Sequence, residues 1–315
     1  MSARPRTLHD TAGRATAAGP PEFMSVKQVA EYLHLNEKKI YALVREHKIP
    51  ATKITGKWVF PRDLVDRWLL ESSHGGLLTD RLVIAGSDDP LLYHLVLALA
   101  NSVQSKALVS YSPTGTRLGL DLLSASRADV GCVHWGPEQE SRLRHPALLQ
   151  QYPSHRHWVL VRAFLREQGL MVRPDALKPD TDIATLLKAP LRWVLRQDGA
   201  GTRRFLQETL AEHGMREADL NVVSTGFSER ESSSQIAMGG ADIGPGIRAS
   251  ASEFGLAFFS VGWEAFDFTL GRGVYFRTLF QNLLETLRST EAVAYSERLG
   301  GYDLSGAGEI IWGLD

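Results

Sequence analysis

Cysteine and long apolar runs are scarce in this 315-residue sequence. The single cysteine, Cys132, excludes an internal disulfide, and its apolar setting predicts a buried thiol in a reducing compartment. No apolar run approaches the ~20 residues that a membrane-spanning helix needs. Residues 1–22 are rich in Ala, Gly, Pro and Arg and lack the apolar core of a signal peptide. We therefore expect a cytoplasmic protein with a disordered tail over residues 1–23.

Catalytic motifs are missing as well. The sequence has no G-x-S-x-G, no H-E-x-x-H and no paired cysteines, and Gly56-Lys57 lacks the upstream glycine of a Walker loop. Four histidines lie close in sequence, but their spacing matches no familiar metal site, and we expect them at surfaces or turns: His134, His145, His155 and His157. The expectation is a protein that is not an enzyme and has no metal and no cofactor.

The charges are distributed unevenly. The net charge of the chain is −1, yet residues 24–72 hold nine Lys and Arg against six Asp and Glu, a balance of +3. Residues 1–23 contribute +1, so the remainder of the chain carries −5. A small basic region beside a large acidic one suits a nucleic-acid contact made by the basic region alone.

Residues 24–48 carry the pattern of two short helices. Ser25-Val26-Lys27-Gln28 is a capping box, and apolar side chains follow it at helical spacing: Val26, Val29, Ala30 and Leu33. After a short turn, Asn36 is a good cap for a second helix, whose expected buried face is Ile40, Leu43, Val44 and His47. Its opposite face carries cations. Two helices joined in this way predict a helix-turn-helix with the second helix in a major groove.

A hairpin and a third helix complete this region. Residues 53–60 read as a hairpin with Gly56 at its turn, and Pro61 opens a helix with Leu64, Val65, Trp68 and Leu69 facing inward. With the Val-x-x-Val-Ala-x-x-Leu helix, Lys48-Ile49-Pro50 and Lys57-Trp58-Val59-Phe60-Pro61 in this order, residues 24–70 resemble the excisionase and MerR-type winged DNA-binding family. The expected DNA contacts are Asn36, Lys38, Lys39, Tyr41, Arg45, Lys53 and Lys57. A cationic face can simply be solvated, and a three-helix module can bind protein instead; turn, wing and charge together favour DNA.

Beyond a polar linker at residues 73–80, strand and helix patterns alternate, which is typical of an α/β fold with a mainly parallel sheet. One internal echo stands out. Ala128-Asp129-Val130-Gly131 and Ala241-Asp242-Ile243-Gly244 share a pattern, each after a helix that ends in small residues. Two similar α/β lobes would produce this repeat.

The large region, residues 81–315, resembles the type II periplasmic-binding-protein fold in its cytoplasmic form, fused to excisionase-like readers. The runs that carry the resemblance are Gly86-Ser87-Asp88-Asp89, Ser112-Pro113-Thr114-Gly115, Arg166-Glu167-Gln168-Gly169-Leu170, residues 196–203, residues 241–247 and Gly300-Gly301-Tyr302. The resemblance implies lobe one at about 81–157 and 268–315, lobe two at about 158–267, and a hinge near 158–166 and 261–268. The chain departs from it at residues 229–234, where relatives usually have a Thr-His pair.

Ligands of open α/β sheets bind outside the carboxyl ends of strands, where helix N-termini offer free N–H donors to an anion. The candidate ligand residues are Ser87, Ser112, Thr114, Gly115, Gly201, Thr202, Arg203 and Ser233. For each of these residues taken alone, a role as a helix cap or turn is the better interpretation, and only several of them in one cleft favour a ligand site. The family resemblance implies molybdate or tungstate, whereas an arginine suits a carboxylate, so a small organic acid or amino acid is an alternative.

The sequence thus predicts an α/β protein with an N-terminal winged helix-turn-helix and a two-lobed ligand-binding domain. The function that this architecture indicates is that of a transcription regulator that senses a small anion and binds operator DNA, as a homodimer. The alternative from another class is an excisionase-like architectural protein that needs no ligand, although such a protein has no use for a two-lobed cleft.

Overall fold

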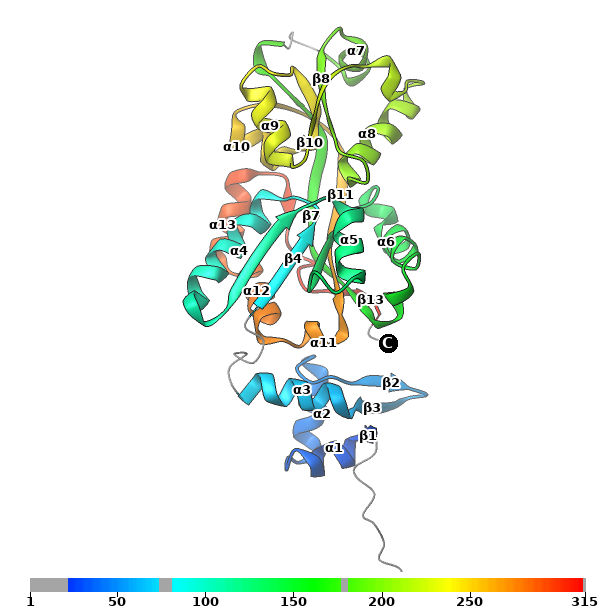
Figure 1. Cartoon of the computed structure of the whole chain (residues 1–315), viewed down its shortest axis with the longest axis vertical. Coiled ribbons are helices and arrows are strands. Elements are labelled where there is room, and N and C mark those ends of the chain that lie inside the picture. Colours follow the sequence, from blue (N-terminus) through cyan, green and yellow to red (C-terminus); the bar gives the residue numbers. More distant parts are fainter. Residues whose placement is uncertain (1–21, 74–80, 177–180, 314–315) are drawn as a thin grey trace, which may run out of the picture.

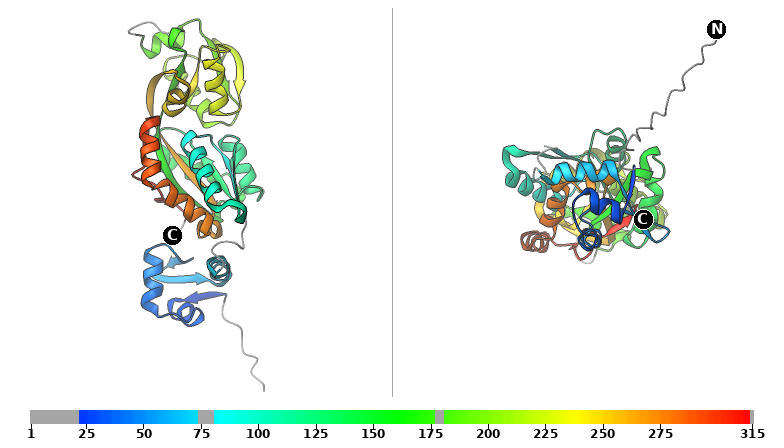
Figure 2. Two further views of the ribbon diagram at one scale, coloured as in Figure 1. Left: turned by 90° about the vertical axis from the view of Figure 1, so that its left-hand side faces the viewer. Right: turned by 90° about the horizontal axis from the view of Figure 1, so that it is seen from below.

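A computed structural model of the chain describes residues 22–73, 81–176 and 181–313 (Figure 1). The expected disordered tail, apart from its last two residues, and the expected linker after residue 73 lie outside the described residues. A small N-terminal domain, which we call the reader (residues 22–73), lies at one end of the molecule, next to a larger domain (Figures 1 and 2). In the described ranges no helix has the length and apolar character required to cross a membrane.

The reader combines three helices with a small antiparallel sheet. Its elements are β1 (Phe23–Ser25), α1 (Val26–Tyr32), α2 (Glu37–Arg45), β2 (Thr52–Ile54), β3 (Lys57–Pro61) and α3 (Arg62–Ser73). The predicted capping box at Ser25 and Gln28 is confirmed, because each side chain accepts the other residue's backbone N–H. The side chain of Asn36 caps α2 by accepting the N–H of Lys39 at 2.8 Å. The ends of the first two reader helices are thus fixed by hydrogen bonds between residues that are close in sequence.

Three features of the reader differ from the sequence-based expectation. Residues 23–25 form a strand, β1, that pairs with β3, so the sheet has the order β1-β3-β2. His47, expected in the core, is exposed: α2 ends at Arg45, and a φ of 52° turns His47 away from the helix's buried face. Leu69 was expected to face inward but is 43% exposed, because the buried stripe of α3 is narrower than its apolar residues suggest.

The larger domain consists of two α/β lobes joined by two long strands. Lobe one contains β4 (Arg81–Gly86), α4 (Pro90–Val103), β5 (Leu108–Pro113), α5 (Thr116–Ser124), β6 (Val130–Val133), α6 (Ser141–Leu149), α11 (Arg272–Tyr275), α12 (Thr278–Leu287), α13 (Thr290–Leu299), β12 (Tyr302–Asp303) and β13 (Ile310–Trp312). Lobe two contains α7 (Ile183–Lys188), β8 (Arg192–Arg196), α8 (Gly201–Glu212), β9 (Asn221–Gly226), α9 (Glu229–Ala237), β10 (Ile243–Ile247) and α10 (Arg248–Phe254).

The connecting strands are β7 (Trp158–Val172) and β11 (Ala257–Gly271), which pair antiparallel along almost their whole length. The sheet order is β5-β4-β6-β11-β7-β10-β8-β9, with β12 and β13 also paired to β7. β11 meets lobe one through β6, and β7 meets lobe two through β10. Both lobes therefore share one continuous sheet, which runs through β7 and β11 (Figure 1). Within these two strands Arg166 pairs with Glu264.

The internal echo in the sequence corresponds to an equivalent contact in each lobe. Asp129, just before β6, accepts the backbone N–H of Val83 on β4 with its Oδ2, at 2.9 Å. Asp242, just before β10, accepts the backbone N–H of Arg192 on β8 in the same way, also at 2.9 Å. Each aspartate joins two neighbouring parallel strands at their amino ends. The repeated Ala-Asp pattern thus has the same structural task in both lobes.

Candidate functional site

The two lobes face each other across a cleft into which charged side chains of both extend. Lobe one contributes Ser87, Asp88 and Asp89 after β4, and lobe two contributes the end of β8 and the first turns of α8 and α9. β7 and β11 form the floor of the cleft. Because parallel strands of both lobes end here, the cleft lies where an open α/β sheet is expected to bind ligands.

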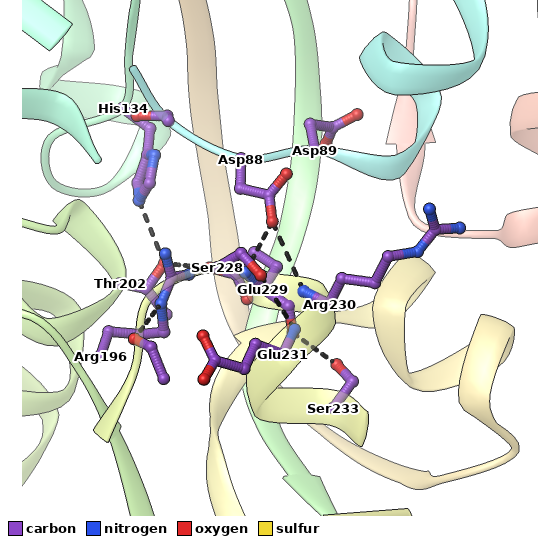
Figure 3. A network of polar contacts seen from close by, with 12 residues as sticks. Asp88, Asp89, His134, Arg196, Thr202, Ser228, Glu229, Arg230, Glu231 and Ser233 are labelled. Carbon is purple, nitrogen blue, oxygen red and sulfur yellow. Dashed lines mark hydrogen bonds and ion pairs between the residues drawn. The ribbon is translucent and has the colours of Figure 1, made fainter. Parts of the chain in front are cut away.

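At the centre of the lobe-two side lies a buried carboxylate, that of Glu229 (Figure 3). Its Oε1 accepts a short, charged hydrogen bond from Nη1 of Arg196. The hydroxyl of Thr202 donates to the same oxygen at 2.6 Å. Arg196 and Glu229 are 2% and 1% exposed, so this ion pair is shielded from solvent. The Arg196 guanidinium and the Thr202 hydroxyl together form a binding site for an anionic oxygen, and the Glu229 carboxylate occupies it.

A second carboxylate bridges the lobes. Oδ2 of Asp88, in lobe one, accepts the backbone N–H of Glu229 at 2.7 Å and, more weakly, that of Arg230 at 3.4 Å (Figure 3). These N–H groups belong to the first turn of α9 in lobe two, where the helix dipole is positive. Asp88 therefore holds the lobes together by the kind of contact that a bound anion would make.

Arg166, on β7, links the floor of the cleft to lobe one. Its Nε donates to Glu264 at 2.7 Å, and its Nη1 donates to the carboxylate of Asp89 at 2.9 Å and to the carbonyl of Asp88 at 2.7 Å. Burial raises the pKa of Glu264 to about 7, although Arg166 acts in the opposite direction. Burial likewise raises the pKa of Asp89. The guanidinium and the carboxyl groups of this part of the site are thus shielded from water and stabilise one another.

His134 connects Arg166 to Thr202, and its protonation can be deduced. Burial, followed by the charges of Arg166 and Arg196, holds its pKa well below the usual range, so the ring is neutral at pH 7. Nη2 of Arg166 lies 3.2 Å from its Nδ1, and because a guanidinium can only donate, Nδ1 must accept. The proton is then on Nε2, which donates to the hydroxyl of Thr202 at 3.3 Å. Thr202 in turn donates to Glu229, so one directed chain of hydrogen bonds crosses the cleft.

The eight ligand candidates from the sequence fall into different environments. Thr202 lies in the network, and Gly201 lies against His134, since a Cβ there would come within 2.3 Å of the His134 carbonyl oxygen. Ser87 is buried with its hydroxyl 2.8 Å from that of Thr116. Ser112 is exposed. The hydroxyl of Thr114 is buried and has no partner among the described residues.

The remaining candidates lie next to the network or away from it. Gly115 lies near the side chain of Gln197, 3.1 Å from where its Cβ would be. Arg203 forms ion pairs with Glu217 and Asp198 and does not contact Glu229. The Ser233 hydroxyl donates to the Glu229 carbonyl, one turn back along α9. The structure therefore brings Gly201 and Thr202 to the centre and leaves Arg203 on other partners.

Sequence reasoning did not select the charged core of the site: Arg166, Arg196, Glu229, Glu264 and His134. His134 and His145 were expected at surfaces or turns but are 2% and 0% exposed. His134 is in the cleft, and His145 binds Asp267 through Nδ1 at 2.7 Å. Charged residues inside the otherwise apolar 158–172 segment were a usable signal, because a charge in a buried strand needs a partner.

The expected DNA-binding residues lie on the reader surface. Lys38, Lys39, Tyr41 and Arg45 are exposed on one side of α2, and Lys57 is exposed beside the wing's turn. Lys53 is exposed too, with its ammonium 5.8 Å from the centre of the Trp58 ring. Within the described ranges none of these cations forms an ion pair. They are therefore available to phosphates, while Asn36 is engaged as the cap of α2.

Comparisons with known proteins agree with this architecture. Residues 98–288 match the PBP superfamily domain, and residues 23–73 match a helix-turn-helix domain. An uncharacterised protein of Bacillus subtilis (strain 168), YvgK, is 22% identical over 312 residues, covering 91% of this chain and 97% of that protein. The predicted fold class is thus confirmed, a mixed α/β protein with a helix-turn-helix before a periplasmic-binding-protein-like domain.

Two solved structures share the fold at low identity. The tungstate ABC transporter protein from Geobacter sulfurreducens is 14% identical, with a TM-score of 0.50, and covers 69% of this chain and 97% of its own. An H2O2-bound mutant of Corynebacterium glutamicum OxyR is 13% identical, also with a TM-score of 0.50, and covers 87% of this chain and 90% of its own. At this identity the likeness concerns the fold alone.

Proposed function

Because this chain belongs to the PBP superfamily domain family and carries a helix-turn-helix domain, we propose that it is a transcription regulator that senses a small anion. The reader binds operator DNA, as a homodimer in the cytoplasm, and the cleft between the lobes binds the ligand. The combination of a DNA-binding domain with a ligand-binding domain favours a regulator over an enzyme and over a ligand-independent architectural protein.

One observation carries the ligand part of this proposal: the Glu229 carboxylate occupies a ready-built anion site. Arg196 and Thr202 both direct their hydrogens at Glu229 Oε1. In the proposed mechanism a ligand's anionic group replaces this carboxylate. The contact between Asp88 of lobe one and α9 of lobe two then remains or breaks, depending on how the ligand fits between them.

The surroundings favour a carboxylate over molybdate or tungstate, the oxyanions implied by family resemblance. The occupant of the site is itself a carboxylate, and its main donor is an arginine, which suits a planar group with two oxygens. Two buried guanidiniums, of Arg166 and Arg196, face four carboxyl groups: Asp88, Asp89, Glu229 and Glu264. A dianion would add two negative charges to a cluster that already has an acidic excess. We therefore propose a small organic acid or amino acid as the ligand.

A path from the cleft to the reader supports the regulatory part. The reader lies against lobe one, where α3 contacts α11 (Figure 1). A cavity of about 510 Å³ separates other parts of the two surfaces, with His47 and Trp58 on the reader side and Phe276 and Ile310 on the lobe-one side. A contact packed this loosely can change at little cost when lobe one moves relative to lobe two.

The test combines ligand binding with DNA binding on the full chain. A thermal-shift panel contains molybdate, tungstate, small carboxylates and amino acids, and an operator is selected from a random duplex library. We expect one carboxylate-bearing compound to raise the melting temperature and to change operator affinity about 5- to 150-fold, the usual range of allosteric coupling. Lys38→Ala is the matched control, because it should weaken DNA binding and leave the ligand's thermal shift intact.

Three results would count against parts of the proposal. A response to molybdate or tungstate alone would refute the choice of a carboxylate. Binding without any change in operator affinity would refute the regulatory role. Consumption of the bound compound would show an enzyme.

A further inference from the structure

At the mouth of the cleft lies a small acidic pocket of about 180 Å³ between the lobes. Its charged lining consists of Asp88, Asp89, Glu229, Glu253 and Arg230. Arg230, the single cation in that lining, forms an ion pair with Glu253, and its guanidinium lies 5.1 Å from the centre of the Tyr93 ring. Of the other three carboxyl groups, Asp89 pairs with Arg166 and Glu229 with Arg196 from outside this lining, whereas Asp88 is held by backbone N–H groups.

Glu229 forms the wall between this pocket and the anion site. Its Oε1 is held by Arg196 and Thr202, whereas its Oε2 is buried and has no hydrogen-bond partner in the described part of the chain. A buried carboxylate oxygen without a donor is rare in folded proteins and points to a missing one. Glu229 also lines the acidic pocket, so a cation bound there is one source of such a donor.

Charge balance restricts which molecules can displace Glu229 from Arg196. A simple carboxylate would take over Arg196 but would leave the Glu229 carboxylate buried and unpaired, which is strongly unfavourable. A simple amine could bind Glu229 but would not need Arg196, and it would leave that ion pair in place. A molecule that carries both charges replaces the ion pair between Arg196 and Glu229 with two new ones, from its carboxylate to Arg196 and from its ammonium group to Glu229. No buried charge is then left without a partner.

Resting on the proposed function, we infer that the ligand is a small zwitterion, an α-amino acid or a close analogue. Its carboxylate binds Arg196 and the Thr202 hydroxyl, and its ammonium group binds the carboxylates of Glu229 and Asp88 in the acidic pocket. The pocket, with a volume of about 180 Å³, has room for the ammonium end of such a ligand. Glu229 is thereby the residue that selects for the amino group, a positioning and specificity role.

Matched sets of compounds test this inference by calorimetry on the full chain at pH 7. Each set consists of an α-amino acid, the same acid without its amino group and the same amine without its carboxylate, such as alanine, propionate and ethylamine. We expect one or a few amino acids to bind, and their two partial analogues to bind about 100-fold more weakly or not at all, as sites built around buried polar groups reject ligands that leave them unpaired.

The variant Glu229→Gln tests the residue. It keeps the shape of the side chain and removes the charge that a simple carboxylate would leave unpaired. The preference for the amino acid over its des-amino analogue should therefore fall from about 100-fold to less than tenfold, mainly because the analogue binds more tightly. Glu231→Gln, on the exposed side of the same helix, is the control and should keep the full preference.

The outcomes separate this inference from the proposed function. A des-amino acid that binds the wild-type protein as tightly as its amino acid would overturn the inference and leave a carboxylate-sensing regulator. An amine that binds as tightly as the amino acid would overturn it too, as would an unchanged preference in folded Glu229→Gln. Binding of molybdate or tungstate without any amino acid would overturn both this inference and the choice of a carboxylate, and would leave a regulator that senses an oxyanion. The wild-type comparison decides the matter even if the variant does not fold.

Discussion

The reader and the cleft use charge in opposite ways. On the reader, Lys38, Lys39, Arg45 and Lys57 extend into solvent, and none has an acidic partner in the described ranges. In the cleft, Arg166 and Arg196 are 1% and 2% exposed, and each is ion-paired with at least one buried carboxylate. The reader can therefore meet a polyanion without rearrangement, whereas the cleft must break its own ion pairs before it binds anything.

Because of this difference, we expect the reader to bind DNA with little discrimination and the cleft to bind its ligand selectively. Exposed cations attract any phosphate backbone and depend strongly on salt. Buried pairs respond only to a ligand that replaces every bond it breaks, because an unpaired buried charge is far more unfavourable than an exposed one. A regulator gains from having both, general attraction at the DNA and strict discrimination at the ligand.

The largest effect should come from Arg166→Met. This change leaves Glu264 and Asp89 without their buried guanidinium, and breaking such a pair costs about 3–5 kcal/mol of folding free energy. Urea denaturation monitored by tryptophan fluorescence measures the change. Arg127→Met, which replaces an exposed arginine of lobe one, should alter the free energy of unfolding by less than about 0.5 kcal/mol. Equal effects of the two variants would abolish the contrast between buried and exposed charge.

The next effect concerns pH and Glu264. Its pKa in the folded protein is raised from 4.5 to about 7, so the folded state keeps a proton that the unfolded state has lost. The stability that this carboxyl group contributes is complete below pH 4.5 and falls as the pH rises through 7. The loss amounts to about 3 kcal/mol at 1.4 kcal/mol per pKa unit.

The variant Glu264→Gln isolates this effect, because glutamine resembles the protonated acid at every pH. Relative to the wild type, it should gain stability between pH 4.5 and pH 8 in equilibrium unfolding. Glu297→Gln, on the exposed side of α13, should follow the wild-type curve. A constant difference between Glu264→Gln and the wild type across this range would show that Glu264 titrates normally.

Thr202→Val should have an intermediate effect. It removes the donor to Glu229 and leaves the Nε2–H of His134 unpaired, for a loss of about 1–3 kcal/mol in unfolding free energy. Ligand affinity should change less than tenfold. The Thr202 hydroxyl donates a hydrogen bond to Glu229 in the free protein and to the ligand in the complex, so its loss weakens both states. Arg203→Ala breaks partly exposed ion pairs with Glu217 and Asp198 and should cost less than about 1 kcal/mol. A larger loss for Arg203→Ala would reverse our ranking of the two.

The smallest effects should come from the reader. Lys38→Ala and Arg45→Ala each remove one exposed cation from α2, so folding stability should hardly change. Removing one phosphate interaction should flatten the log–log salt dependence of operator binding by about 0.9. Lys57→Ala at the wing should weaken binding to all sequences alike. An unchanged slope in both α2 variants, measured by fluorescence anisotropy, would show that α2 is not the helix in the groove.

Local signals determined much of this molecule. The capping box at Ser25, the cap at Asn36 and the hairpin turn at Gly56 involve neighbours within a few residues, and each appears where the sequence predicts it. The alternation of strands and helices indicated the α/β class, and the Ala-Asp echo indicated two related lobes. These features depend on short-range periodicity and backbone chemistry, which a sequence displays directly.

Only the tertiary structure decided how the cleft is occupied. Asp88 meets the N–H of Glu229 across 141 positions of sequence, and Arg166 meets Glu264 across 98. Neither spacing has a period that a single sequence reveals. Arg203 was a reasonable ligand candidate beside Thr202, yet one position further along α8 turns it toward Glu217, while Arg196 faces the cleft. A buried charge is explained only by its partner, and the fold alone brings the partners together.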